Sequence, residues 1–153
     1  MRLNSSPEKI FPLLCPVREH EWIELWTCEM VFSRSGLAEL DCVFQTDFAD
    51  DGPQDTWVIS RYEPPERLEF VRINAVRAMR YAITLSREDE AHTRAEWKQV
   101  LTSLNVEGEK VLKALTPEAY AEEMGMIERM LNHFLATGER LSIGGGGSVD
   151  EVV

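Results

Sequence analysis

Six segments of the sequence alternate apolar and polar residues, and only short turns separate them. This period of two is typical of strands with one buried face, and it predicts strands over 26–32, 41–48, 56–62, 67–73, 77–86 and 93–104. A crossover between parallel strands needs about a dozen residues or more. The connections here are shorter, so we expect an antiparallel meander.

Two short helical segments are expected before this meander. A serine cap at Ser5 or Ser6, followed by Pro7, begins the first of them, and Pro16 prevents its continuation. The stretch 17–26 favours a second short helix or helical turn. The chain before Ser5 leaves room for only a short first strand.

Two more helices are expected after the last strand. Asn105 caps a short one to about residue 115, and Thr116 caps a long one that Gly138 ends. The apolar face of the long helix is wide, so it must lie across the sheet. Gly125 in its middle predicts a close approach of helix and sheet.

The charge balance excludes several classes of partner. The net charge is -11, from 27 acidic and 16 basic residues, in a chain of 153 residues that is 44% apolar. Such a surface repels phosphate backbones and anionic lipid, so we expect neither nucleic-acid binding nor membrane association. No apolar run is long enough for a membrane span. We expect a cytoplasmic protein and leave open whether it forms a homodimer.

The chain is expected to form one domain over residues 1–141, with a flexible Gly-rich tail over 142–153. The three cysteines lie in apolar neighbourhoods and are expected to be buried thiols in a reducing compartment: Cys15, Cys28 and Cys42. No cysteine or histidine pair has the spacing of a metal site, and no phosphate-binding loop is present. We therefore expect neither a metal nor a cofactor.

Four stretches resemble one superfamily. SPEKIFPLLCPVREHEWIELW (6–26) resembles the opening of bacterial polyketide cyclase-like SRPBCC proteins, and the stretches 35–44, 56–65 and 130–138 are similar to later parts of them. The likeness covers nearly the whole chain before the tail. The chain is identified as a member of the START/polyketide-cyclase-like (SRPBCC, Bet v 1-like) superfamily.

This resemblance implies an α+β helix-grip fold: a curved antiparallel sheet wraps a long C-terminal helix, and two short helices follow a short first strand. Members include polyketide cyclases, binders of lipids and hormones, and regulators of a chaperone. A deep cavity separates sheet and helix in the family. No single catalytic motif carries over to this chain.

Arg18 and Glu19 are the sharpest candidates for chemistry, because the family's short helices border the mouth of the cavity. Arg18 could anchor an anionic or carbonyl group, with Glu19 or Glu21 as acid or base. The structural alternative is an arginine–carboxylate pair that fixes the short helices to the sheet.

Large aromatic side chains are candidates for the cavity wall, where they could stack on a ring-shaped ligand. Each could equally belong to the core. The predicted ligand-binding set is completed by side chains on the long helix: Trp22, Trp26, Trp57, Trp97, Tyr120, Met130 and Phe134.

His133, Arg61 and Arg72 are further candidates. His133 lies beside the apolar face of the long helix, as a base in the cavity or as a histidine bonded to a backbone carbonyl. Arg61 and Arg72 interrupt apolar strand faces, so either could be a cation inside the cavity or a strand end that reaches solvent.

Three functions follow in order. The first is binding of a small hydrophobic or aromatic ligand in an internal cavity. The second is a cyclase-like or hydrolase-like enzyme, without metal, that acts on such a ligand. The third is a partner-binding module, which needs an exposed apolar patch in place of a deep pocket.

Overall fold

The computed structural model describes residues 1–48 and 53–143. Seven strands form one sheet in the order β1-β7-β6-β5-β4-β3-β2, and every neighbouring pair is antiparallel. The strands are β1 (Arg2–Leu3), β2 (Glu29–Phe32), β3 (Val43–Thr46), β4 (Asp55–Glu63), β5 (Arg67–Ile73), β6 (Arg77–Arg87) and β7 (Thr93–Ser103). Apart from β1, this is the meander that the short connections predict.

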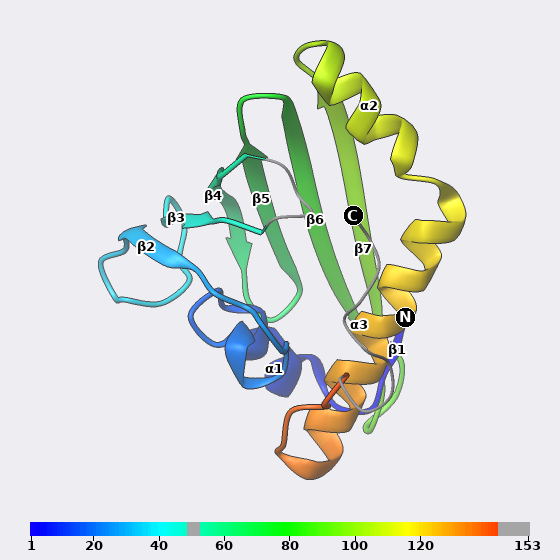
Figure 1. The fold of residues 1–153 in the computed structure, drawn as a ribbon. Helices are drawn as coiled ribbons and strands as arrows, with labels where there is room; N and C mark the ends of the chain where they lie inside the picture. The colour runs from blue at the N-terminus through cyan, green and yellow to red at the C-terminus, as the bar shows by residue number, and fades with distance from the viewer. Residues whose placement is uncertain (49–52, 144–153) are drawn as a thin grey trace.

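Helices flank the sheet at both ends of the chain. Before β2 lie α1 (Pro7–Ile10) and the 3-10 turns η1 (Phe11–Leu14) and η2 (Glu19–Glu21), and after β7 lie α2 (Val106–Ala114) and α3 (Pro117–Thr137). The curved sheet and the long α3 face one another, with α1 closing the lower end (Figure 1). The fold is therefore an α+β helix grip, as the sequence predicts.

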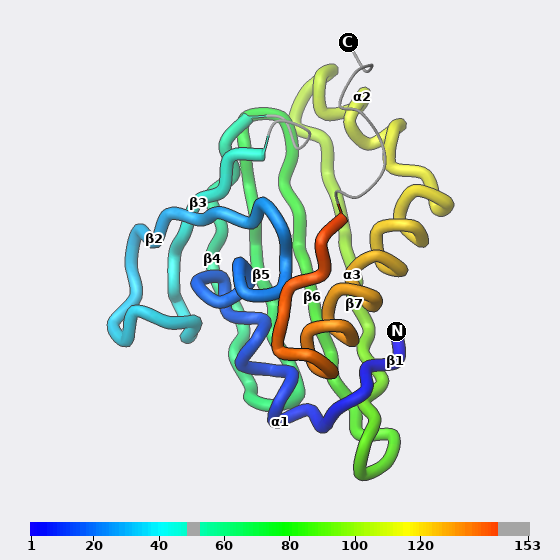
Figure 2. The backbone as a smooth tube through the Cα atoms, turned by 60° about the horizontal axis from the view of Figure 1, so that its bottom comes forward, coloured from blue at the N-terminus to red at the C-terminus, as the bar shows by residue number. Residues whose placement is uncertain are grey.

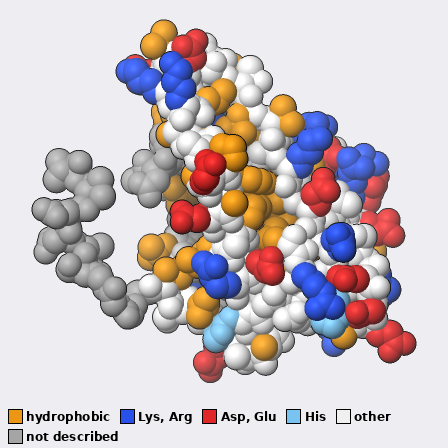
Figure 3. All heavy atoms as spheres, turned by 90° about the vertical axis from the view of Figure 1, so that its right-hand side faces the viewer, with side chains coloured by type: hydrophobic (Ala, Val, Ile, Leu, Met, Phe, Trp, Pro, Cys, Tyr) orange, Lys and Arg blue, Asp and Glu red, His pale blue; other side chains and the backbone are white. Residues whose placement is uncertain are grey.

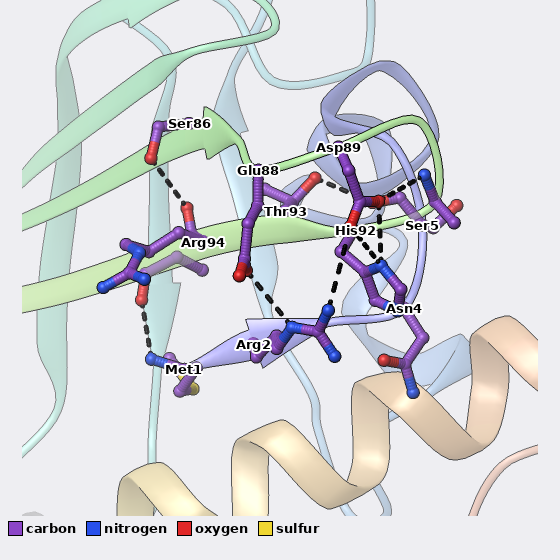
Figure 4. Close-up of polar contacts among 12 residues, drawn as sticks. Met1, Arg2, Asn4, Ser5, Ser86, Glu88, Asp89, His92, Thr93 and Arg94 are labelled. Carbon is purple, nitrogen blue, oxygen red and sulfur yellow. Dashed lines mark hydrogen bonds and ion pairs between the residues drawn. The ribbon is translucent and has the colours of Figure 1, made fainter.

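The first strand is short but well fixed. Arg2 and Leu3 pair with the start of β7, and the Met1 ammonium group donates to the Ala95 carbonyl at 2.9 Å. Figure 4 shows the Arg2 guanidinium beside the β6–β7 hairpin, where its Nε lies 3.2 Å from the Glu88 carboxylate. Backbone pairing and this charge contact hold the N-terminus on the sheet edge.

Tryptophan side chains shape the segment before β2. The indole Nε1 of Trp22 donates to the Leu13 carbonyl at 2.8 Å, and that of Trp26 donates to the Pro16 carbonyl at 2.8 Å. Leu25 adopts a positive φ of 66°. These contacts hold a compact loop, so the short helix expected over 17–26 is reduced to the 3-10 turn η2.

Local signals place the C-terminal helices as predicted. Asn105 accepts from the Gly108 amide at 3.1 Å, and Thr116 accepts from the Ala119 amide at 3.2 Å. Gly138 ends α3 with a φ of 73°. Both N-caps and the C-terminal stop are confirmed.

The close approach predicted at Gly125 is wrong. A Cβ at Gly125 would meet only the Arg129 side chain of the same helix, at 3.6 Å. The tight contact lies at Gly108 on α2, where a Cβ would stand 2.0 Å from the Val76 carbonyl oxygen. Helix α3 therefore keeps its distance from the middle of the sheet.

The chain after α3 turns back along the loop that carries η2 (Figure 2). Arg140 donates to the His20 carbonyl at 3.2 Å, and the Ile143 amide donates to the Glu24 carboxylate at 3.0 Å. Most of the predicted tail, and most of the turn predicted over 49–54, lie outside the described residues.

Cys15, Cys28 and Cys42 are free thiols, and Cys15 and Cys42 are buried. Within residues 1–48 and 53–143, no helix has the length and apolar character that a membrane span requires.

Candidate functional site

A cavity of about 500 Å³ lies between the concave face of the sheet, helix α3 and the η2 loop. Its wall is mainly apolar and rich in aromatic rings: Trp22, Trp26, Phe44, Phe48, Trp57, Phe70, Tyr81 and Trp97. On the side of the molecule that Figure 3 shows, hydrophobic side chains gather in the middle of the face with acidic side chains around them. A pocket of this size and lining suits a small organic ligand.

The floor of the cavity is a continuous aromatic cluster. Phe44 and Trp57 are opposite one another on β3 and β4, with ring centroids 5.3 Å apart and nearly parallel planes. Phe70 packs edge-on against Trp57 at 5.6 Å, and Tyr81 lies 6.2 Å from Phe70 on the next strand. The period of two places all four rings on the concave face.

Three of the four indoles bond their N–H groups to the protein itself. Trp22 and Trp26 donate to carbonyls of the N-terminal segment, and Trp57 donates to the Thr46 hydroxyl at 2.9 Å. With these polar atoms bonded within the protein, the rings offer mainly apolar and π surface to the cavity.

A buried charge cluster closes one part of the wall. The Arg77 guanidinium donates to both oxygens of Asp55, at 3.0 and 2.9 Å, and Arg72 bonds the same carboxylate. The Arg72 guanidinium also stacks over the Trp57 ring, 4.1 Å from its centroid. Asp55 and Arg77 are almost fully buried. The cluster therefore ties the ends of β4, β5 and β6 together.

Glu19 is the carboxyl group most altered by this environment. Burial raises its pKa from 4.5 to about 8, although part of the residue reaches solvent at the rim. Within residues 1–48 and 53–143, no group donates a hydrogen bond to its side chain. Desolvation of the carboxylate is uncompensated, so near neutral pH much of Glu19 carries a proton.

Tyr81 on the cavity floor responds to the same groups. Burial first, and then the negative charges of Glu123 and Glu19, raise the pKa of its phenol well above the ordinary value, while a hydrogen bond with Gln99 lowers it. Glu19 and Glu123 belong to η2 and α3, so carboxylates from two elements act on a hydroxyl of the sheet. Tyr81 stays neutral and can donate or accept a hydrogen bond.

The structure places six of the sequence-predicted site residues in the cavity wall: Glu19, Trp22, Trp26, Trp57, Trp97 and Met130. Five others stand apart from it: Arg18, Arg61, Tyr120, His133 and Phe134.

Arg18 pairs with Glu21 and not with Glu19. Its Nε and Nη2 donate to the two Glu21 oxygens at 2.9 and 3.0 Å, within a single turn. Arg18 borders a separate pocket of about 180 Å³ between the N-terminal segment and Leu37. The arginine–carboxylate pair thus stabilises the loop that holds Glu19, and it does not reach the sheet.

A β-bulge decides the position of Arg61. Between Ile59 and Arg61 the register of β4 on β5 shifts, so Tyr62 takes the inward parity and contacts Phe11. Arg61 then pairs with exposed Glu63 at 2.8 Å. Arg72 is the arginine that lines the cavity, because it shares the inward parity of Phe70.

The remaining candidates lie on α3. The Tyr120 hydroxyl donates to the Trp97 carbonyl at 2.6 Å and so fastens the start of α3 to β7. Phe134 packs against the core. His133 is half-buried, and its carbonyl accepts from the Thr137 hydroxyl at 2.8 Å.

Sequence reasoning missed part of the wall, namely Phe44, Phe70, Gln99 and Glu123. Strand parity could have found three of these. Phe44 is opposite Trp57, Phe70 is opposite Tyr81, and Gln99 is two residues after Trp97. Glu123 gave no such signal, because its side of α3 is set by how the helix sits over the sheet.

Solved structures share this architecture. DynU16, a protein in the dynemicin biosynthetic locus, matches with a TM-score of 0.57 and 17% identity over 91% of this chain and 46% of its own. A protein of Rhodobacter sphaeroides matches with a TM-score of 0.60 and 21% identity over 90% and 91%. CalU16 from Micromonospora echinospora matches with a TM-score of 0.50 and 18% identity over 87% and 85%.

This chain spans about half the length of DynU16. No protein-family model matches the sequence, and neither does any curated protein. The chain has the SRPBCC, polyketide-cyclase-like fold that these structures share. At such identities the likeness establishes the fold and assigns no ligand.

Proposed function

We propose that this protein binds a small hydrophobic or aromatic molecule in the cavity between the sheet and α3. The cavity itself carries the proposal: about 500 Å³, with eight aromatic side chains in its wall. Natural sites for small ligands fall in this range of volume and are mostly apolar with a few polar groups. The position of DynU16 in a biosynthetic locus is in keeping with a role on small organic molecules.

A neutral fluorescent probe tests this function. N-phenylnaphthylamine should bind with one site per chain and should quench the tryptophans that line the cavity. Ile127 on α3 lines the cavity, and Ile127→Trp should fill it and weaken binding by at least about tenfold. Val106→Trp is the matched control, because Val106 is 66% exposed on α2.

Equal loss of binding in both variants, or no binding by the wild type, would contradict a role for the cavity. Cooperative urea unfolding of each variant confirms that a loss of binding does not come from misfolding.

An enzyme that acts on the bound molecule is the second candidate. The observation that favours it is Glu19, whose pKa of about 8 makes it a proton donor inside an apolar wall. Tyr81 supplies a neutral hydroxyl on the floor. A carboxylic acid that keeps its proton near neutral pH is suited to general acid catalysis. If the protein turns over a ligand, Glu19→Gln should abolish turnover and leave binding of the neutral probe unchanged.

A further inference from the structure

The charges in the cavity wall are unequal. Three carboxylates line it, Glu19, Glu24 and Glu123, against a single guanidinium, that of Arg72. The carboxylates come from two sides, the η2 loop and α3. An apolar wall with this distribution holds a negative potential in a medium of low dielectric constant.

The one guanidinium in the wall is held by the protein. Arg72 bonds the buried Asp55 carboxylate and stacks on Trp57 at 4.1 Å. An anionic ligand would have to compete with Asp55 for this group and would also face the three carboxylates. The wall therefore disfavours a ligand with a negative charge.

Glu19 and Glu24 differ in what holds them. The Glu24 carboxylate accepts from the Ile143 amide at 3.0 Å. For Glu19, no donor is present in the part of the chain that the structure describes. Its carboxyl group lines the cavity without a hydrogen bond from the protein, and the negative charges of Glu19 and Glu123 already act on Tyr81. A cation in the cavity would relieve both effects.

The aromatic rings favour the same charge. Trp22, Trp26 and Trp57 direct their N–H groups to protein oxygens. Their π faces attract a cation, most strongly when it is withdrawn from water. A neutral carbonyl ligand would gain only from the proton of Glu19, and its oxygen would be repelled by the other carboxylates.

We propose that the cavity selects an aromatic molecule that carries a basic nitrogen, with Glu19 as the counter-ion of the ammonium group. This inference rests on the proposed function and names the class of ligand. Binding converts Glu19 to its charged form, so it releases a proton to solvent below the pKa of the empty site. The titratable or charged groups that face Glu19 are Glu24 on its own loop, Cys28 beside β2, Arg72 on β5, Tyr81 on β6 and Glu123 on α3.

Three probes of one shape test the inference: naphthylmethylamine, naphthylmethanol and naphthoic acid, which are cationic, neutral and anionic at neutral pH. Isothermal titration calorimetry at about pH 7 should give at least about tenfold tighter binding of the amine than of the acid. The alcohol should fall between them. Repeating the amine titration in buffers of different ionisation enthalpy should show proton release approaching about one per site.

Two matched variants locate the effect. Glu19→Gln should reduce the amine-to-acid ratio several-fold and abolish the proton release, while naphthylmethanol binds as before. Glu21→Gln makes the same change two residues away, outside the cavity and paired with Arg18. It should alter neither the ratio nor the proton release.

The outcomes separate the two proposals. If naphthoic acid binds as tightly as the amine, or if Glu19→Gln leaves the ratio intact, the inference is overturned while ligand binding stands. If the three probes and N-phenylnaphthylamine all fail to bind, the proposed function fails and the inference falls with it.

Discussion

Replacement of Glu19 by Gln should change how the stability of the protein depends on pH. The folded pKa of Glu19 is raised from 4.5 to about 8 by burial. Below the lower value the side chain is neutral in both the folded and the unfolded protein, so Glu19 brings no penalty. Between the two values the unfolded chain ionises first, and the folded state loses stability as the pH rises. Above about pH 8 the full penalty is present.

The size of this effect follows from the two pKa values. Each pH unit between them is worth about 1.4 kcal/mol, which gives at most about 5 kcal/mol. Water that enters the open cavity screens the charge, so we expect about 2 to 3 kcal/mol in practice. Glu19→Gln keeps the shape of the side chain and cannot ionise. The variant should therefore match the wild type at about pH 4 and be more stable by this amount at about pH 9.

Urea unfolding at a series of pH values measures the difference in free energy of unfolding between the two proteins. A difference that does not change between about pH 5 and pH 8, or that changes in the opposite direction, would refute the reasoning.

Glu21→Gln is the control of opposite sign. The hydrogen bond from Arg18 lowers the pKa of Glu21, so its contribution is present above the unfolded pKa and is lost as the pH falls. That variant should be less stable than the wild type at neutral pH, by at most about 1 kcal/mol, and should equal it in acid.

Two further predictions concern stability alone, each measured by urea unfolding at neutral pH. Asp55→Ala should cost about 3 to 5 kcal/mol, because it leaves two buried arginines without their shared carboxylate, and a loss below about 1 kcal/mol would contradict this account. Gly108→Ala should be strongly destabilising, since its Cβ would stand 2.0 Å from a backbone oxygen, whereas Gly125→Ala should stabilise α3 by about 0.5 to 1 kcal/mol. Similar effects at the two glycines would show that α2 moves to accommodate the added methyl group.

Short-range patterns in the sequence determined the elements of this fold. The alternation over 67–73 coincides with β5, and Asn105, Thr116 and Gly138 mark the helix ends where the structure has them. Each signal acts through neighbours within a few residues, so it can be read without knowing the rest of the chain. The short connections then allowed only an antiparallel sheet.

Contacts between distant segments decided the site. The bulge after Ile59 turned Arg61 outward, and a shared parity with Phe70 turned Arg72 inward. The sequence indicated Glu19 as a candidate, but its raised pKa depends on desolvation by elements far away in the chain. Burial and charge act through space, so these properties exist only once α3 and the η2 loop face the sheet.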